Sequence, residues 1–202
     1  MKKTKKQNVF RLTLISLFIA VMAVMNFTPL GYITTGAFSI TLMTIPVALG
    51  AACGGMWGGA VLGVMFGLTS FLQAFGIGFM IDPLAATLFN ENPIAYTVTC
   101  FVPRILAGLL SGLVIYLFEK TRRMSIWKFA LAAMVVPIVN TFGFLGFYMA
   151  FYSGTALGAD LIMAVITAAL TLNFLVEFSV TLVASAVINR TVYFFTKKLS
   201  HR

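Results

Sequence analysis

Six long apolar runs constrain this chain more than any other feature of its sequence. They cover approximately residues 9–27, 40–53, 57–72, 95–118, 127–151 and 161–195. A helix needs about 20 apolar residues to cross the hydrocarbon core of a bilayer. A soluble fold has no means of burying a chain that is 60% hydrophobic and only 9% charged. The runs therefore predict an all-α membrane protein with six transmembrane helices, folded as a single integral membrane domain over residues 1–202.

The basic residues predict how these helices are oriented. All but one of the 14 Lys and Arg residues fall in three clusters, at residues 2–11, 120–128 and 190–202, and each cluster lies beside an apolar run. The loops after the first, third and fifth runs contain no Lys or Arg. Because basic residues accumulate on the cytoplasmic side of membrane proteins, we expect both termini to be cytoplasmic. The net charge of +9 is then a topology signal and does not indicate nucleic-acid binding.

The sequence contains none of the residue patterns expected of an enzyme or a metal site. The single histidine, His201, is in the C-terminal tail, and Cys53 and Cys100 have no Cys or His partner at metal-ligand spacing. We find no nucleophile–base pair, no paired catalytic carboxylates and no phosphate-binding glycine loop. We therefore expect no enzyme activity, metal or cofactor in this chain, and a membrane enzyme is the least favoured alternative.

Small residues at helical spacing predict where helices pack closely. Ala51, Gly55, Gly59, Gly63 and Gly67 recur every four residues from the second run, through the residues between, into the third, and would form one flat stripe. We expect this stripe to contact a neighbouring helix of the same chain. A moving or partner-facing surface is the alternative.

A few polar residues interrupt the apolar runs, and each is costly in a membrane unless it is paired or faces water. Arg104, Asn140, Asn173 and Glu177 lie in the fourth, fifth and sixth runs, at positions that place them in the outer half of the membrane. Gln73 ends the third run on the same side. These residues predict a ligand cavity open to the outside. Alternatively, Arg104 and Glu177 form an ion pair that only joins helices, the asparagines are interhelical hydrogen-bond partners, and Gln73 lies at the water interface.

The same residues indicate binding rather than catalysis. An arginine guanidinium remains charged and donates in a fixed fork that suits a carboxylate, while asparagine amides suit hydroxyl and amide groups. The segment 73–94 between the third and fourth runs is apolar but interrupted by Gly76, Gly78, Pro83 and Pro93. Such an interrupted segment predicts a structured outer cap over the ligand and not another spanning helix.

Several stretches resemble the substrate-binding S components of energy-coupling factor (ECF) vitamin transporters. The strongest similarity is SITLMTIPVALGAACGGMWGGAVLGVMFGLTSF, which resembles the proline-containing helix and the glycine-rich helix of that family. PRILAGLLSG and PIVNTFGF, in the fourth and fifth runs, are weaker similarities. The chain is most similar to the pantothenate branch, where an arginine of the fourth helix and an asparagine of the fifth match Arg104 and Asn140. Pantothenate carries a carboxylate, two hydroxyls and an amide, which suit these two side chains.

The resemblance implies a substrate-binding subunit of the prokaryotic plasma membrane that captures a small water-soluble vitamin, with pantothenate favoured. It also implies a transmembrane coupling subunit and two ATPase subunits, which use ATP. The family's first helix contacts the coupling subunit through an Ala-xxx-Ala pattern, and Ser16, Ala20 and Ala23 take its place here. The alternatives are an S component for hydroxymethylpyrimidine, riboflavin or folate, and a membrane scaffold subunit without a transport function.

Overall fold

Long apolar helices dominate the computed structural model of this protein, which describes residues 5–34, 39–79, 83–120, 127–153 and 174–184. The long helices are α1 (Lys5–Asn26), α2 (Thr44–Leu72), α4 (Pro93–Lys120) and α5 (Trp127–Tyr152). Each is long and apolar enough to cross a membrane, and a shorter apolar helix, Phe174–Ala184, lies within the last predicted run. The described part of the chain is thus that of a helical membrane protein.

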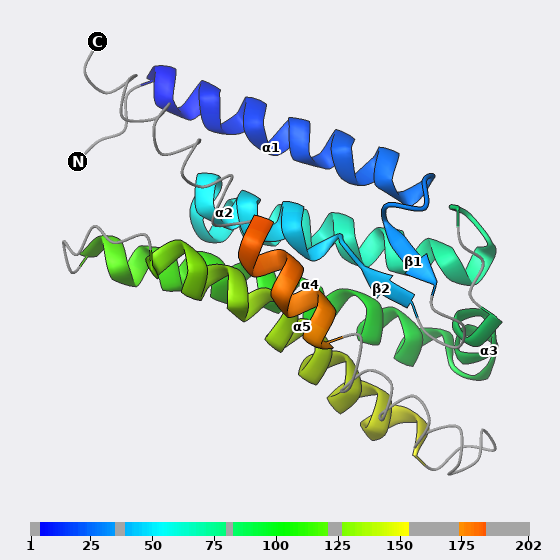
Figure 1. The fold of residues 1–202 in the computed structure, drawn as a ribbon. Helices are drawn as coiled ribbons and strands as arrows, with labels where there is room; N and C mark the ends of the chain where they lie inside the picture. The colour runs from blue at the N-terminus through cyan, green and yellow to red at the C-terminus, as the bar shows by residue number, and fades with distance from the viewer. Residues whose placement is uncertain (1–4, 35–38, 80–82, 121–126, 154–173, 185–202) are drawn as a thin grey trace.

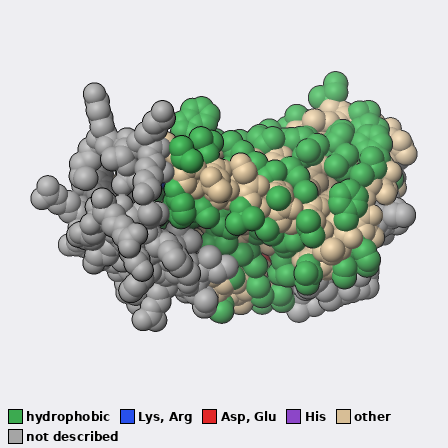
Figure 2. All heavy atoms as spheres, turned by 90° about the horizontal axis from the view of Figure 1, so that it is seen from above, with side chains coloured by type: hydrophobic (Ala, Val, Ile, Leu, Met, Phe, Trp, Pro, Cys, Tyr) green, Lys and Arg blue, Asp and Glu red, His purple; other side chains and the backbone are tan. Residues whose placement is uncertain are grey.

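The helices lie side by side in one bundle around α2. This helix packs against α1, α4 and α5, and α4 also packs against α5 (Figure 1). The short helix Phe174–Ala184, drawn in orange, lies beside the start of α2. Figure 2 shows hydrophobic side chains spread over the described face of the bundle, as expected of a surface that contacts lipid.

A reversal inside α2 separates the second and third predicted helices. Gly55 has φ 67° and ψ −151°, which lies outside the helical region and suits only glycine. Residues eight positions apart in a straight helix are separated by about 12 Å. A Cβ atom added at Gly50 would nevertheless lie 3.3 Å from the carbonyl oxygen of Gly58. The two limbs of α2 therefore fold back on each other, and Gly55 forms the turn. Gly55 is thus not part of a continuous helical stripe, but its backbone still lies close to α4, because a Cβ atom at Gly112 would be 2.6 Å from the Gly55 carbonyl carbon.

The remaining glycines of the stripe bring α2 into backbone contact with α4. A Cβ atom at Gly59 would lie 2.7 Å from the carbonyl carbon of Gly108, and one at Gly63 would lie 2.9 Å from the Cα atom of Ile105. A Cβ atom at Gly67 would lie 3.1 Å from the Cα atom of Phe101, also in α4. These distances are shorter than ordinary carbon–carbon contacts, so only glycine allows the two helices to approach this closely. The prediction of close helix packing is confirmed for these three positions.

A short antiparallel hairpin adds to the all-α architecture expected from the sequence. Strand β1 (Tyr32–Thr34) pairs with β2 (Ser39–Thr41), with Tyr32 opposite Thr41. As a result, the second predicted helix starts at Thr44 instead of residue 40. The hairpin and α3 (Pro83–Glu91) lie at the same end of the bundle (Figure 1). With nine residues, α3 is too short to span a bilayer, and it lies within the segment predicted to form a cap.

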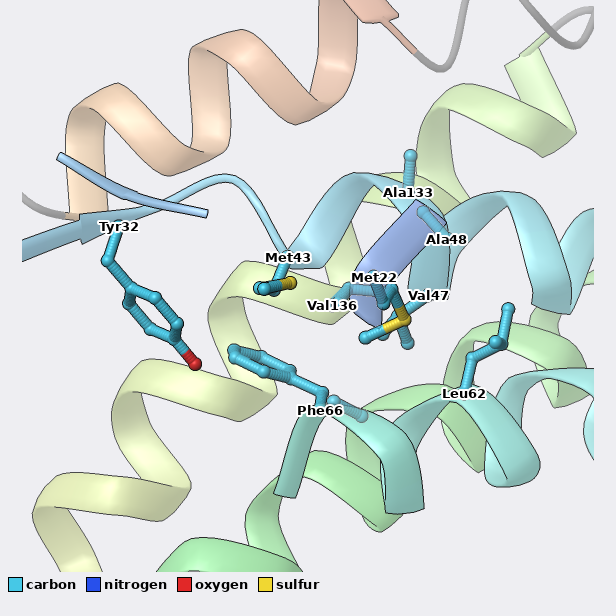
Figure 3. Packing of buried hydrophobic residues seen from close by; sticks show 10 residues of the cluster. Met22, Tyr32, Met43, Val47, Ala48, Leu62, Phe66, Ala133 and Val136 are labelled. Carbon is cyan, nitrogen blue, oxygen red and sulfur yellow. The ribbon is translucent and has the colours of Figure 1, made fainter. Parts of the chain in front are cut away.

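The hairpin is anchored in the core of the bundle. Tyr32 descends from β1 with its hydroxyl end toward Phe66 of α2 (Figure 3). The tyrosine belongs to a buried cluster that joins the hairpin to α1, α2, α4 and α5. The members of this cluster are Met22, Tyr32, Met43, Val47, Ala48, Leu62, Phe66, Ala107, Ala133 and Val136. Because Tyr32 is buried there, the hairpin is held against the end of the helices that also carries α3.

Candidate functional site

A cavity of about 150 Å³ is lined by residues of the hairpin, α2, α3, α4, α5 and the helix Phe174–Ala184. The 3-10 turn η1 (Gln73–Phe75), which directly follows α2, also contributes to its wall. The lining comes from segments far apart in the sequence, so the cavity exists only in the folded bundle. Its polar groups are therefore the first place to look for ligand contacts.

Four of the five predicted substrate-binding residues line this cavity: Gln73, Arg104, Asn140 and Glu177. Their exposed fractions are 8%, 8%, 6% and 0%, so all four are buried. The fifth, Asn173, lies outside the described residues. The fold thus brings together polar side chains from η1, α4, α5 and the helix Phe174–Ala184.

Arg104 is held in the cavity by neutral groups. Its Nη1 donates a hydrogen bond to the carbonyl oxygen of Thr99 at 2.5 Å. Its guanidinium carbon lies 5.4 Å from the ring centroid of Phe66 and 5.3 Å from that of Phe144, within cation–π range. These contacts fix the position of the guanidinium without neutralising its positive charge.

Three polar atoms in the cavity wall have no hydrogen-bond partner within the part of the chain that the structure describes. They are Arg104 Nε, Gln73 Nε2 and Asn140 Oδ1. More than nine in ten buried polar groups in proteins are hydrogen-bonded, so unpartnered atoms grouped around one cavity indicate that a ligand or water completes them. Two of the three atoms are donors and one is an acceptor.

Glu177 connects the cavity to the hairpin. The backbone N–H of Thr41 donates to Glu177 Oε1 at 3.3 Å, and one helical turn further the hydroxyls of Thr181 and Thr44 are hydrogen-bonded at 2.8 Å. The Arg104 guanidinium thus donates to the Thr99 carbonyl, whereas the Glu177 carboxylate accepts from the backbone of Thr41. These two hydrogen bonds of Glu177 and Thr181 hold the helix Phe174–Ala184 to the end of β2 and the start of α2.

Sequence reasoning missed most of the cavity wall. Tyr32 reaches it from the hairpin, and its hydroxyl lies 3.1 Å from Thr69 Oγ1 and 3.2 Å from Ser70 Oγ. The aromatic rings around Arg104 were also missed, because phenylalanine is common throughout this chain and carries no positional signal. Leu84, Ala85 and Leu88 of α3 complete the wall. Only the interrupted pattern of segment 73–94 pointed to these three.

The predicted docking residues lie on α1, away from the cavity. Ser16 and Ala20 are exposed, whereas Ala23 is half-buried. The opposite face of α1 packs on α2, where Ile15 contacts Gly54. Ser16 and Ala20 thus belong to a face of α1 that no other described part of the chain covers.

Comparison with known proteins identifies the family. Residues 10–189 match the family of substrate-specific components of ECF transporters. This chain belongs to that family. Among curated proteins, the pantothenic acid transporter PanT of Lactococcus lactis subsp. cremoris (strain MG1363) is 29% identical over 154 residues, which cover 73% of this chain and 77% of PanT. The protein is therefore a membrane S component, a class of transporter subunit and not of enzyme.

Proposed function

We propose that this S component binds pantothenate from outside the cell and delivers it inward with a separate energising module. The observation that carries the proposal is Arg104, a buried arginine whose contacting groups in the described structure are neutral and which lines a cavity. Such a group favours a ligand with a carboxylate. Similarity to a pantothenic acid transporter supports the same ligand.

The carboxylate preference of Arg104 narrows the choice among the alternative vitamins. Riboflavin and hydroxymethylpyrimidine have no carboxylate for Arg104 to bind. Folate has carboxylates, so the competition assay below is what separates it from pantothenate.

The unpartnered atoms suggest how the ligand lies. In this proposal the carboxylate of pantothenate binds Arg104, and its amide and hydroxyl groups meet Asn140, Gln73 and Glu177. Asn140 Oδ1 accepts a hydrogen bond from the ligand, and Gln73 Nε2 donates one. Asn173, which lies four residues before Glu177 in the sequence, remains a predicted contact.

The remaining predictions from the family are part of the same proposal. The chain crosses the prokaryotic plasma membrane six times, with both termini in the cytoplasm. The exposed face of α1 with Ser16 and Ala20, bordered by Ala23, docks on a transmembrane coupling subunit. Two ATPase subunits of the module use ATP, and this chain itself requires no cofactor.

A competition binding assay on the purified chain tests the proposal. We expect labelled pantothenate to bind without ATP, to be displaced by unlabelled pantothenate, and to be unaffected by riboflavin, folate or hydroxymethylpyrimidine. Arg104→Ala and Arg104→Lys should each weaken binding by at least about 10-fold, because lysine lacks the planar fork. Arg11→Lys is the matched control. Arg11 is in the N-terminal part of α1 and does not line the cavity, so this variant should leave affinity unchanged. Displacement by another vitamin, or full affinity in Arg104→Ala, would contradict the proposal.

A further inference from the structure

Arg104 is preceded by a proline in the interior of α4. Pro103 lies well inside this helix, which runs from Pro93 to Lys120. In an α-helix the N–H of each residue donates to the carbonyl oxygen four positions earlier, but proline has no N–H. The carbonyl oxygen of Thr99 is therefore left without its usual helical partner.

The side chain of Arg104 occupies this vacated acceptor. Its Nη1 donates to Thr99 O at 2.5 Å, and both residues are buried. We propose that Pro103 is a positioning residue for the ligand-binding arginine: by freeing the Thr99 carbonyl, it supplies the acceptor that fixes the Arg104 guanidinium in the cavity. This inference rests on the proposed function, in which Arg104 binds the ligand's carboxylate.

The rest of the environment makes this hydrogen bond decisive for the orientation of Arg104. The rings of Phe66 and Phe144 contact the guanidinium and limit where its plane lies. They provide no hydrogen-bond acceptor, so they leave the guanidinium free to slide along the ring faces and to turn about its Nε–Cζ bond. The Thr99 carbonyl restrains both movements by accepting a hydrogen bond from Nη1. It thereby presents Nε, which has no partner among the described residues, together with the adjacent Nη2. These two nitrogens form the fork that binds both oxygens of a carboxylate.

Pro103 also packs against α5, so a purely structural role is the competing explanation. A Cβ atom at Gly143 of α5 would lie 3.0 Å from the Cβ of Pro103. The two explanations make opposite predictions for Pro103→Ala. If the proline only packs, its loss weakens the helix contact and lowers stability. If it positions Arg104, alanine restores the helical hydrogen bond, stability does not fall, and the carboxylate contact is lost.

The experiment measures binding of pantothenate and of its neutral alcohol analogue, in which the carboxylate is replaced by CH₂OH, to the full chain in detergent. For Pro103→Ala we expect pantothenate affinity to fall by about 10-fold, affinity for the alcohol to stay within about 2-fold, and the melting temperature not to fall. In the Arg104→Ala background, Pro103→Ala should cause no further loss, because the two residues act through one contact. Pro137→Ala, which removes the interior proline of α5, is the matched control and should not discriminate between the two ligands.

Any one of three results would overturn the role of Pro103. They are an equal loss of affinity for both ligands, a parallel fall in melting temperature, and additive losses of affinity in the double variant. A measurement without ligand separates this outcome from failure of the proposed function. In a ¹⁵N-arginine NMR spectrum, rotation of the Arg104 guanidinium should be slow in the unaltered chain and at least about 10-fold faster in Pro103→Ala. Unchanged rotation would overturn the inference even where pantothenate binds. Absent pantothenate binding with faster rotation would overturn the proposed function alone.

Discussion

Gly63→Ala is expected to reduce ligand affinity through the backbone of α4, without touching any side chain in the cavity. Gly63 lies on the limb of α2 that follows the reversal, and it faces the backbone of α4 at Arg104 and Ile105. A Cβ atom there would lie 2.9 Å from Ile105 Cα and 3.0 Å from the carbonyl carbon of Arg104. Both neighbours are backbone atoms, so no side-chain rotation relieves the contact.

The size of the effect follows from these distances. Carbon atoms pack at about 3.5–4.0 Å, so the methyl group is about 0.5–1 Å too close and α4 must shift by that amount. Overpacking of this kind costs about 1–3 kcal/mol of stability. Because a hydrogen bond with a carboxylate tolerates little displacement, we expect pantothenate affinity to fall by about 10-fold.

Two glycine variants make the measurement interpretable. At Gly146 of α5 a Cβ atom would meet nothing within 4 Å, so Gly146→Ala should leave both stability and affinity intact. Gly59→Ala crowds the carbonyl carbon of Gly108 at 2.7 Å, one helical turn from Gly63 along α2. It should lower the melting temperature as much as Gly63→Ala does, with a smaller loss of affinity. Equal affinity losses in the Gly59 and Gly63 variants, or none in either, would refute the idea that α2 sets the position of Arg104.

Three further predictions concern docking, the cavity and the hairpin. Ala20→Leu should prevent co-purification with the coupling subunit and abolish uptake while affinity stays within about 2-fold, because Ala20 lies on the exposed face of α1; intact uptake would exclude this docking face. Cys100 lines the cavity, so saturating pantothenate should slow its labelling by maleimide by at least about 10-fold, measured in a Cys53→Ser background. Equal labelling rates with and without pantothenate would place the ligand elsewhere. Tyr32→Phe should speed ligand release by about 5-fold, since it removes a hydroxyl that contacts Thr69 and Ser70; an unchanged rate in stopped-flow measurements would show that the hairpin does not limit release.

The sequence predicted the helical framework because the bilayer imposes a strong and simple constraint on it. The apolar runs at 9–27, 95–118 and 127–151 coincide closely with α1, α4 and α5. The hairpin was not predicted, because its strands have three residues each and leave too short an alternating pattern to detect. Tyr32 and Thr41 anchor it to the bundle, through burial in the core and a hydrogen bond to Glu177, and no local pattern encodes these tertiary contacts.

The sequence predicted only part of the candidate site, again because local patterns do not encode tertiary contacts. Polar side chains in an apolar run attract attention because each is costly there, and this logic found Arg104, Asn140 and Glu177. It did not show that Arg104 bonds to Thr99. Pro103 and Arg104 are adjacent in the sequence, but the connection between them depends on where the arginine side chain turns. The sequence also did not predict that Phe66 and Phe144 contact Arg104, because nothing in it distinguishes these two residues from phenylalanines that face lipid.

We expect tight binding to need both the carboxylate and the hydroxyls of the ligand, because different parts of the cavity wall would meet them. The Thr99 carbonyl and the two aromatic rings orient the guanidinium and leave its charge to be met by a ligand anion. Across the same cavity, Glu177 accepts a hydrogen bond from the backbone of Thr41 and so holds the hairpin to the last helix. A ligand with a carboxylate at one end and hydroxyl donors at the other would join α4 to the helix Phe174–Ala184. A fragment with only one of these groups would satisfy one side and leave the other unchanged, so its affinity should fall far below that of pantothenate.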